Sequence, residues 1–159
     1  MIEVTESDLL ACLGVERWAE DVLALSPYET AARLLEVAAE KADPLSAEEI
    51  DEAISHHPRI GEAPRGEGAA QDFSRAEQAG LGDDDADLAE QLRAGNEAYE
   101  ERFGRVFIIR AAGRSRAEIL AELERRLELP NATELEIVGR ELREIALLRL
   151  ERLYAKELQ

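Results

Sequence analysis

The stretch from residue 131 to residue 153, NATELEIVGRELREIALLRLERL, is predicted to be a helix that Asn131 and Glu134 open. At 100° per residue its apolar side chains gather on one face of a helix. Arg149, seven residues after Leu142, falls near the centre of that face. Because arginine is rarely buried unless it is paired, two interpretations stay open: an ion pair with a buried acid, or a guanidinium that reaches into a ligand site. The apolar residues of this face are Leu135, Val138, Leu142, Ile145 and Leu153.

Helix-start signals recur upstream, as a hydroxyl or amide side chain followed three residues later by an acid. Gly104 is the expected stop of the longest upstream helix. The run from Val106 to Ile109 is the only β-like one, and we expect a buried extended segment or the start of a helix there. The pattern predicts one all-α domain over residues 1–159, with about seven or eight helices and less regular than a simple bundle. The expected helices begin at Thr5, cover about Glu16 to Leu25, start with Ser26-Pro27, begin at Ser46, cover Ser74 to Ala79 and about Asp84 to Phe103, and begin at Ser115 and at Asn131.

Composition narrows the function classes. The chain has 19 basic and 36 acidic residues, a formal net charge of −17, and no concentrated basic run, which argues against nucleic-acid binding. No window approaches the ~18 consecutive apolar residues of a membrane span, and no secretory signal is visible. The single cysteine, Cys12, cannot form an internal disulfide and fits a reducing compartment. We therefore expect a cytoplasmic protein.

The sequence His56-His57-Pro58 stands where the helix that begins at Ser46 should end. A residue before proline is pushed out of α geometry, so His57 should lie at the rim of the long Gly-rich loop that follows, residues 58–72. A histidine that caps a helix C-terminus is the simplest interpretation. The functional alternative is a general acid or base, since imidazole titrates near neutrality. A metal site is disfavoured because the short-spaced Cys/His ligand sets of zinc sites are absent.

A second unusual stretch runs from Ser74 to Gly80 and reads SRAEQAG. Ser74 and Glu77 have capping-box spacing, which requires no ligand. A helix N-terminus also presents unpaired N–H groups that suit an anionic or carbonyl-rich small molecule. The motif alone does not decide between these readings.

Taken together, these motifs resemble those of the 2-oxo-4-hydroxy-4-carboxy-5-ureidoimidazoline (OHCU) decarboxylases of urate breakdown. The resemblance covers about Leu9 to Leu153, and the order and spacing of the motifs make it specific. It rests on Trp18-Ala19, on His57-Pro58-Arg59-Ile60-Gly61, on Ser74-x-x-Glu77-Gln78-x-Gly80, on Asn96-x-x-Tyr99-x-x-x-Phe103-Gly104, on Phe107-Ile108-Ile109 and on Arg149-Leu150.

The resemblance implies an all-α, commonly dimeric enzyme that uses neither a metal nor an organic cofactor. Its implied reaction is decarboxylation of the small molecule OHCU to (S)-allantoin. The catalytic residues it implies are His57, Glu77 and Arg149. The implied substrate contacts are Pro58, Ser74, Arg75, Ala76, Glu77, Gln78, Phe107, Ile108, Ile109, Arg110, Ala111 and Arg149.

Other functions remain open at this point. One alternative is a non-catalytic helical adaptor whose acidic surface docks a basic partner. Another is a related decarboxylase or hydrolase that acts on a different ureido compound, and a metal-dependent enzyme comes third. For the oligomeric state, the apolar faces of the last two predicted helices would suit a two-fold homodimer.

Overall fold

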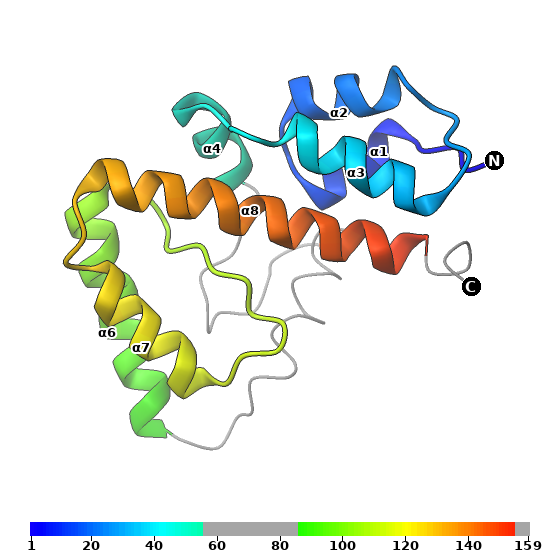
Figure 1. The fold of residues 1–159 in the computed structure, drawn as a ribbon. Coiled ribbons are helices and arrows are strands. Elements are labelled where there is room, and N and C mark those ends of the chain that lie inside the picture. The colour runs from blue at the N-terminus through cyan, green and yellow to red at the C-terminus, as the bar shows by residue number, and fades with distance from the viewer. Residues whose placement is uncertain (56–85, 155–159) are drawn as a thin grey trace. The chain divides into compact units, whose positions relative to one another are not determined.

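The computed structural model describes residues 1–55 and 86–154. Within these ranges the chain forms seven α-helices and no named strand, and one isolated antiparallel bridge joins Ile2 to Tyr28 (Figure 1). The predicted all-α class is confirmed. None of these helices is long and apolar enough to cross a membrane. The helices are α1 (Glu6–Cys12), α2 (Glu16–Leu23), α3 (Ala31–Lys41), α4 (Ala47–Ile54), α6 (Ala86–Phe103), α7 (Arg116–Arg126) and α8 (Asn131–Leu153).

The described residues fall into two compact units. The first unit comprises residues 1–55 and 139–154, and the second comprises residues 86–138, so α8 contributes to both. The predicted single domain over residues 1–159 stays a prediction.

In the first unit, α1 to α4 begin and end largely where the sequence predicts. Thr5 caps α1 by accepting from the backbone N–H of Asp8, and Ser46 with Glu49 forms a complete capping box at α4. Trp18 of α2 is fully buried, and its indole N–H donates to the carbonyl of Ala38 in α3 at 2.9 Å. This bond satisfies the polar end of the largest buried side chain and joins two helices.

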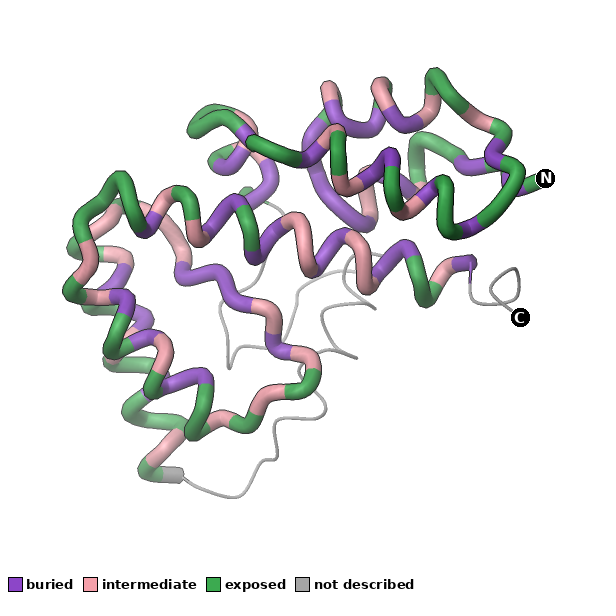
Figure 2. The backbone as a smooth tube through the Cα atoms, viewed as in Figure 1, coloured by how far each residue is buried: buried purple, intermediate pink, exposed green. Residues whose placement is uncertain are grey.

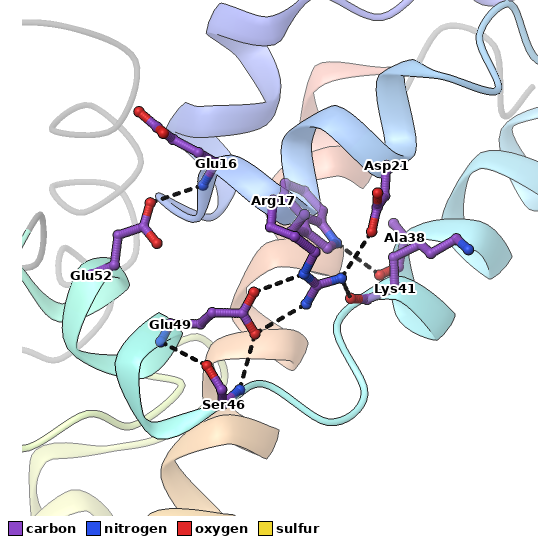
Figure 3. A network of polar contacts seen from close by, with 9 residues as sticks. Glu16, Arg17, Asp21, Ala38, Lys41, Ser46, Glu49 and Glu52 are labelled. Carbon is purple, nitrogen blue, oxygen red and sulfur yellow. Dashed lines mark hydrogen bonds and ion pairs between the residues drawn. The ribbon is translucent and has the colours of Figure 1, made fainter.

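Arg17 ties three helical segments of this unit together (Figure 3). Its guanidinium donates to both carboxylate oxygens of Glu49 in α4, at 2.7 and 3.1 Å. It also donates to Asp21 in α2 and to the carbonyl of Lys41 at the end of α3. Glu49 in turn accepts from the backbone N–H of Ser46 at 3.0 Å, so one carboxylate both caps α4 and anchors it to α2.

The second unit contains the packed pair α6 and α7. Gly104 follows α6 with a positive φ of 73°, and its N–H donates to the carbonyl of Glu100, which confirms it as the stop of that helix. Ser115 and Glu118 form the predicted capping box of α7. The core of the unit consists of Leu92, Tyr99, Phe107, Ile109, Ala111, Ile119, Leu120 and Leu123.

Three helix-level predictions are wrong in detail. Leu25, the expected end of the second helix, lies beyond α2, which ends at Leu23, and its side chain is 51% exposed. The third helix begins after Thr30 rather than at Ser26-Pro27, since Thr30 supplies the N-cap oxygen. Asn131 and Glu134 do not form an N-cap pair. The N–H of Glu134 donates to the carbonyl of Pro130, and its carboxylate is fully buried in an ion pair.

The predicted apolar face of α8 is confirmed. Its buried positions recur at helical spacing and appear as purple segments along the helix in Figure 2. Leu135 and Leu153 lie at the margins of this face and are only partly buried. The buried positions are Glu134, Val138, Gly139, Glu141, Leu142, Ile145, Ala146, Arg149 and Leu150.

Candidate active site

Two parts of the predicted site lie among the described residues, namely Arg149 and the segment from Phe107 to Ala111. All the catalytic and substrate-binding roles stay predictions, including those of Arg149 and of the segment from Phe107 to Ala111. The loop over residues 58–72 and the short helix from Ser74 to Ala79 stay predictions as well. The predicted site residues that lie outside the described residues are His57, Pro58, Ser74, Arg75, Ala76, Glu77 and Gln78.

Arg149 lies on the apolar face of α8 and is only 3% exposed, as its position in the sequence predicts. Its Nη1 donates to the carbonyl of Ala11 at 3.1 Å. Ala11 is in the last turn of α1, where backbone carbonyls lack partners within the helix and carry the negative end of its dipole. One of the five N–H groups of the guanidinium therefore anchors the side chain to α1.

Phe107, Ile108 and Ile109 form a buried segment with exposures of 1 to 3%. The segment has no regular secondary structure, so of the two predicted possibilities the buried extended segment is the one observed. Ala111 is also buried and Arg110 is partly exposed. A buried segment without helix or sheet pairing must find other partners for its backbone polar groups.

One such partner is Arg126, at the end of α7. Its Nη1 donates to the carbonyl of Ile108 at 2.9 Å, and its guanidinium carbon lies 4.6 Å from the ring centroid of Phe107. Arg126 is fully buried, and so is its counterion Glu134. Its Nε lies 2.7 and 3.1 Å from the two carboxylate oxygens, and its Nη2 donates to Oε1 as well. Both carboxylate oxygens of Glu134 therefore accept from Arg126, and these bonds offset the loss of solvation that burial of the two charges costs.

Tyr99 of α6 completes this network. Its hydroxyl donates to Oε1 of Glu134 at 2.7 Å, and its ring packs edge-on against Phe107 with centroids 5.1 Å apart. Burial of the phenol raises the pKa of Tyr99, and its hydrogen bond to Glu134 adds to the rise. Tyr99 therefore remains a neutral donor at physiological pH, and the charge of Glu134 is balanced by Arg126.

Arg126 is a buried polar residue that was not predicted, and the spacing of Glu134 from Asn131 predicted a capping acid rather than a buried counterion. A signal was present, because Arg126 follows Ile119 and Leu123 at helical spacing and so lies on the buried face of α7. The reasoning that singled out Arg149 applies equally to this position. The described residues contain no group of three or more His, Cys, Asp or Glu side chains arranged to hold a metal ion.

Comparison with known proteins gives consistent matches. The family described as OHCU decarboxylase matches residues 3–151. The uric acid degradation bifunctional protein TTL of Arabidopsis thaliana is 29% identical over 158 residues, which cover 97% of this chain and 48% of that protein. A uric acid degradation bifunctional protein of Bacillus sp. (strain TB-90) is 28% identical over 130 residues, which cover 80% of this chain and 25% of that protein. This chain thus spans half or less of the length of these curated relatives.

Solved structures agree with this. A crystal structure of an OHCU decarboxylase in the presence of (S)-allantoin superposes with a TM-score of 0.80 at 28% identity, covering 95% of this chain and 99% of that one. A crystal structure of an (S)-allantoin synthase matches with a TM-score of 0.64 at 19% identity, covering 92% of this chain and 48% of that one, and supports the fold alone. With a family match over nearly its whole length, the chain belongs to the OHCU decarboxylase family.

Proposed function

We propose that this protein decarboxylates OHCU to (S)-allantoin in urate breakdown. The observation that carries the proposal is the match to the OHCU decarboxylase family over residues 3–151. A structural neighbour crystallised in the presence of (S)-allantoin supports the same substrate class, and its own chain is matched over 99% of its length. The buried guanidinium of Arg149 supports it as well, because the resemblance requires an arginine at this position.

The substrate itself explains why a cofactor is unnecessary in this proposal. OHCU carries a hydroxyl and a carboxylate on one ring carbon, next to a C=N bond. When the C–C bond to the carboxylate breaks, its electron pair forms a C=C bond and the adjacent C=N accepts the displaced electrons. Organic cofactors supply such an electron sink to substrates that lack one. The protein is left with orientation, proton transfer and stereochemical control.

In the proposed mechanism, neutral His57 accepts the proton of the substrate hydroxyl, or holds that oxygen, as carbon dioxide departs. Glu77 accepts hydrogen bonds from the ring and ureido N–H groups and orients the imidazole. Arg149 binds carbonyl oxygens and stabilises the negative charge that moves into the ring. The backbone of the segment from Phe107 to Ala111 contacts the substrate. Protonation of the resulting enol on one face gives the (S) product.

The proposal extends to the setting of the enzyme. We place it in the cytoplasm, and we propose that it works as a homodimer without a metal. The apolar faces of α7 and α8 had suggested the dimer, but these faces are buried within the chain. Among the described residues the exposed large apolar side chains are Met1 and Leu25, and neither belongs to α7 or α8. The homodimer therefore rests on the family resemblance, and its contacts would involve other surfaces.

The test is turnover of freshly generated OHCU, followed by circular dichroism of the allantoin formed. The wild-type protein should give (S)-allantoin faster than the spontaneous reaction, which yields a racemate. His57→Asn should lower kcat by about 10²–10⁴-fold, the usual contribution of positioned proton transfer. The neighbouring His56→Asn serves as the matched control and should retain wild-type turnover. Racemic product at the spontaneous rate with wild-type protein would favour the adaptor alternative, and a fully active His57→Asn variant would refute the assignment of the base.

A further inference from the structure

The backbone carbonyl of Ile108 accepts a hydrogen bond from Arg126, a residue outside the segment from Phe107 to Ala111. The segment from Phe107 to Ala111 belongs to no helix or strand, so no regular pattern of backbone hydrogen bonds fixes its path. Arg126 supplies a charged donor to Ile108 at 2.9 Å and lies against the ring of Phe107. The guanidinium thus contacts two consecutive residues of the segment, one through its backbone and one through its side chain.

Arg126 is itself fixed from several sides. Three of its hydrogen bonds go to Glu134, whose carboxylate is held in turn by the hydroxyl of Tyr99. The guanidinium is planar, so the bonds that Nε and Nη2 make to Glu134 also set the direction of Nη1. The position of the Ile108 carbonyl is therefore determined by the ends of two helices, α7 and α8, and by Tyr99 of α6.

We propose that Arg126 is a positioning residue for the reaction: it fixes the backbone of the segment from Phe107 to Ala111 in the geometry that receives the substrate. This inference rests on the proposed function, which assigns substrate contacts to this segment. Arg126 makes no contact with the substrate in this scheme and acts through Ile108 and Phe107. Lysine would keep the positive charge, but a single ammonium lacks the planar fork that joins Glu134 and Ile108 in one rigid unit.

The decisive measurement is the kinetics of Arg126→Lys. Without the hydrogen bond from Arg126 to Ile108, only about a tenth of the molecules should hold the segment in the binding geometry, so KM for OHCU should rise by about tenfold. The ordered segment contacts the substrate and the transition state equally in this scheme, so kcat should stay within about threefold of wild type. The dissociation constant of (S)-allantoin should rise in parallel with KM.

Ser115→Ala is the matched control for stability. It removes the N-cap of α7, the helix that carries Arg126, without touching the network. We expect this variant to unfold at a lower denaturant concentration while its KM stays that of wild type. A rise of KM in Ser115→Ala equal to that in Arg126→Lys would overturn the proposal, because instability of α7 alone would then explain both.

If Arg126→Lys does not fold, KM is measured instead in a triple variant that combines Arg126→Met, Glu134→Leu and Tyr99→Phe. It removes the whole ionic network, and such replacements by apolar residues are often neutral for stability because no buried charge is left unpaired. A positioning role requires that KM remain raised in this folded variant. A wild-type KM there, or in Arg126→Lys, overturns the proposal.

Hydrogen exchange separates this inference from the proposed function. In the ligand-free protein, the amides of Ile108 to Ala111 should exchange at least about tenfold faster in Arg126→Lys than in wild type, with smaller changes in α6. If the wild-type protein does not turn over OHCU, the proposed function fails and this exchange result alone decides whether Arg126 orders the segment. Unchanged exchange at these amides means that Arg126 does not position them.

Discussion

At the scale of single residues, two buried arginines show how a charge on an apolar helix face is satisfied. Arg149 donates to a carbonyl at the end of α1, and Arg126 pairs with Glu134 while donating to Ile108. Arg17 represents a third case at the surface, with its side chain 41% exposed. Arg17 pairs with Glu49, and the contribution of this ion pair to stability can be tested by varying the pH.

Glu49→Gln should flatten the pH dependence of stability in the acid range. Hydrogen bonding from Arg17 lowers the pKa of Glu49 below its ordinary value of 4.5. A carboxyl with a lowered folded-state pKa stabilises the protein above its unfolded pKa, and this contribution is lost as the pH falls through the folded value. The difference in free energy of unfolding between wild type and Glu49→Gln should therefore be present at neutral pH and shrink below about pH 4.5.

Urea denaturation at a series of pH values measures this difference. Glu48→Gln is the matched control, because Glu48 is exposed in the same first turn of α4 while Arg17 keeps its partner. Its pH profile should follow that of wild type. A constant difference between wild type and Glu49→Gln from neutral pH down to pH values well below 4.5 would contradict the assignment.

At the scale of elements, two helical glycines differ in the space around them. A Cβ atom at Gly95 of α6 would lie 2.5 Å from Cδ2 of Leu123 in α7, a fully buried side chain. A Cβ atom at Gly139 of α8 would lie 3.6 Å from Cδ1 of Ile50 in α4, which is an ordinary contact. The first glycine permits close approach of two helices, and the second occupies a site that alanine also fits.

These surroundings predict opposite effects of the same substitution. Overpacking a core costs about 1–3 kcal/mol, while replacing glycine by alanine inside a helix gains up to about 1 kcal/mol. Gly95→Ala should therefore destabilise the protein by about 1 kcal/mol, and Gly139→Ala should stabilise it by up to about 1 kcal/mol. Denaturant midpoints measure both.

A double-mutant cycle checks the physical cause. Leu123→Ala removes the atoms that a Cβ at Gly95 would meet, so Gly95→Ala should become neutral or stabilising in that background. A Gly95→Ala variant as stable as Gly139→Ala would show that α6 and α7 do not pack as closely as described.

At the scale of the whole molecule, the formal net charge of −17 is large for 159 residues. Self-repulsion of such an excess destabilises the compact state, while salt screens exposed charges. Surface ion pairs such as Arg93 with Glu90 and Glu97 also weaken in salt, yet each contributes little to stability because water surrounds both partners. Relief of the repulsion should exceed the loss of these pairs.

The melting temperature at neutral pH should therefore rise as KCl is increased from about 0.01 M to about 0.15 M, where the Debye length falls from about 30 Å to about 8 Å. Near the isoelectric point of about 4.5 the net charge vanishes, so the same salt increase should leave the melting temperature unchanged or lower it. A fall of the melting temperature at neutral pH would mean that ion pairs outweigh the repulsion.

Features that depend on near neighbours along the chain could be predicted from the amino-acid sequence. Cap residues such as Ser46 and Ser115, the stop at Gly104 and the buried face of α8 with Arg149 are set by contacts within a few residues or by helical periodicity. The all-α class followed for the same reason. The resemblance also predicted the family correctly, since the order of motifs is preserved in the sequence.

The partners of residues that lie far apart along the chain could be identified only in the folded structure. Glu134 has the spacing of a capping acid, yet it pairs with Arg126 because a buried guanidinium of α7 comes within hydrogen-bond distance. Likewise, the run after Gly104 has β-like residues but no partner strand is observed for it among the described residues, and side chains from α6 and α7 pack around it instead. Local sequence specifies helices because their hydrogen bonds are local, whereas a buried charge or an irregular segment depends on atoms that only folding brings close.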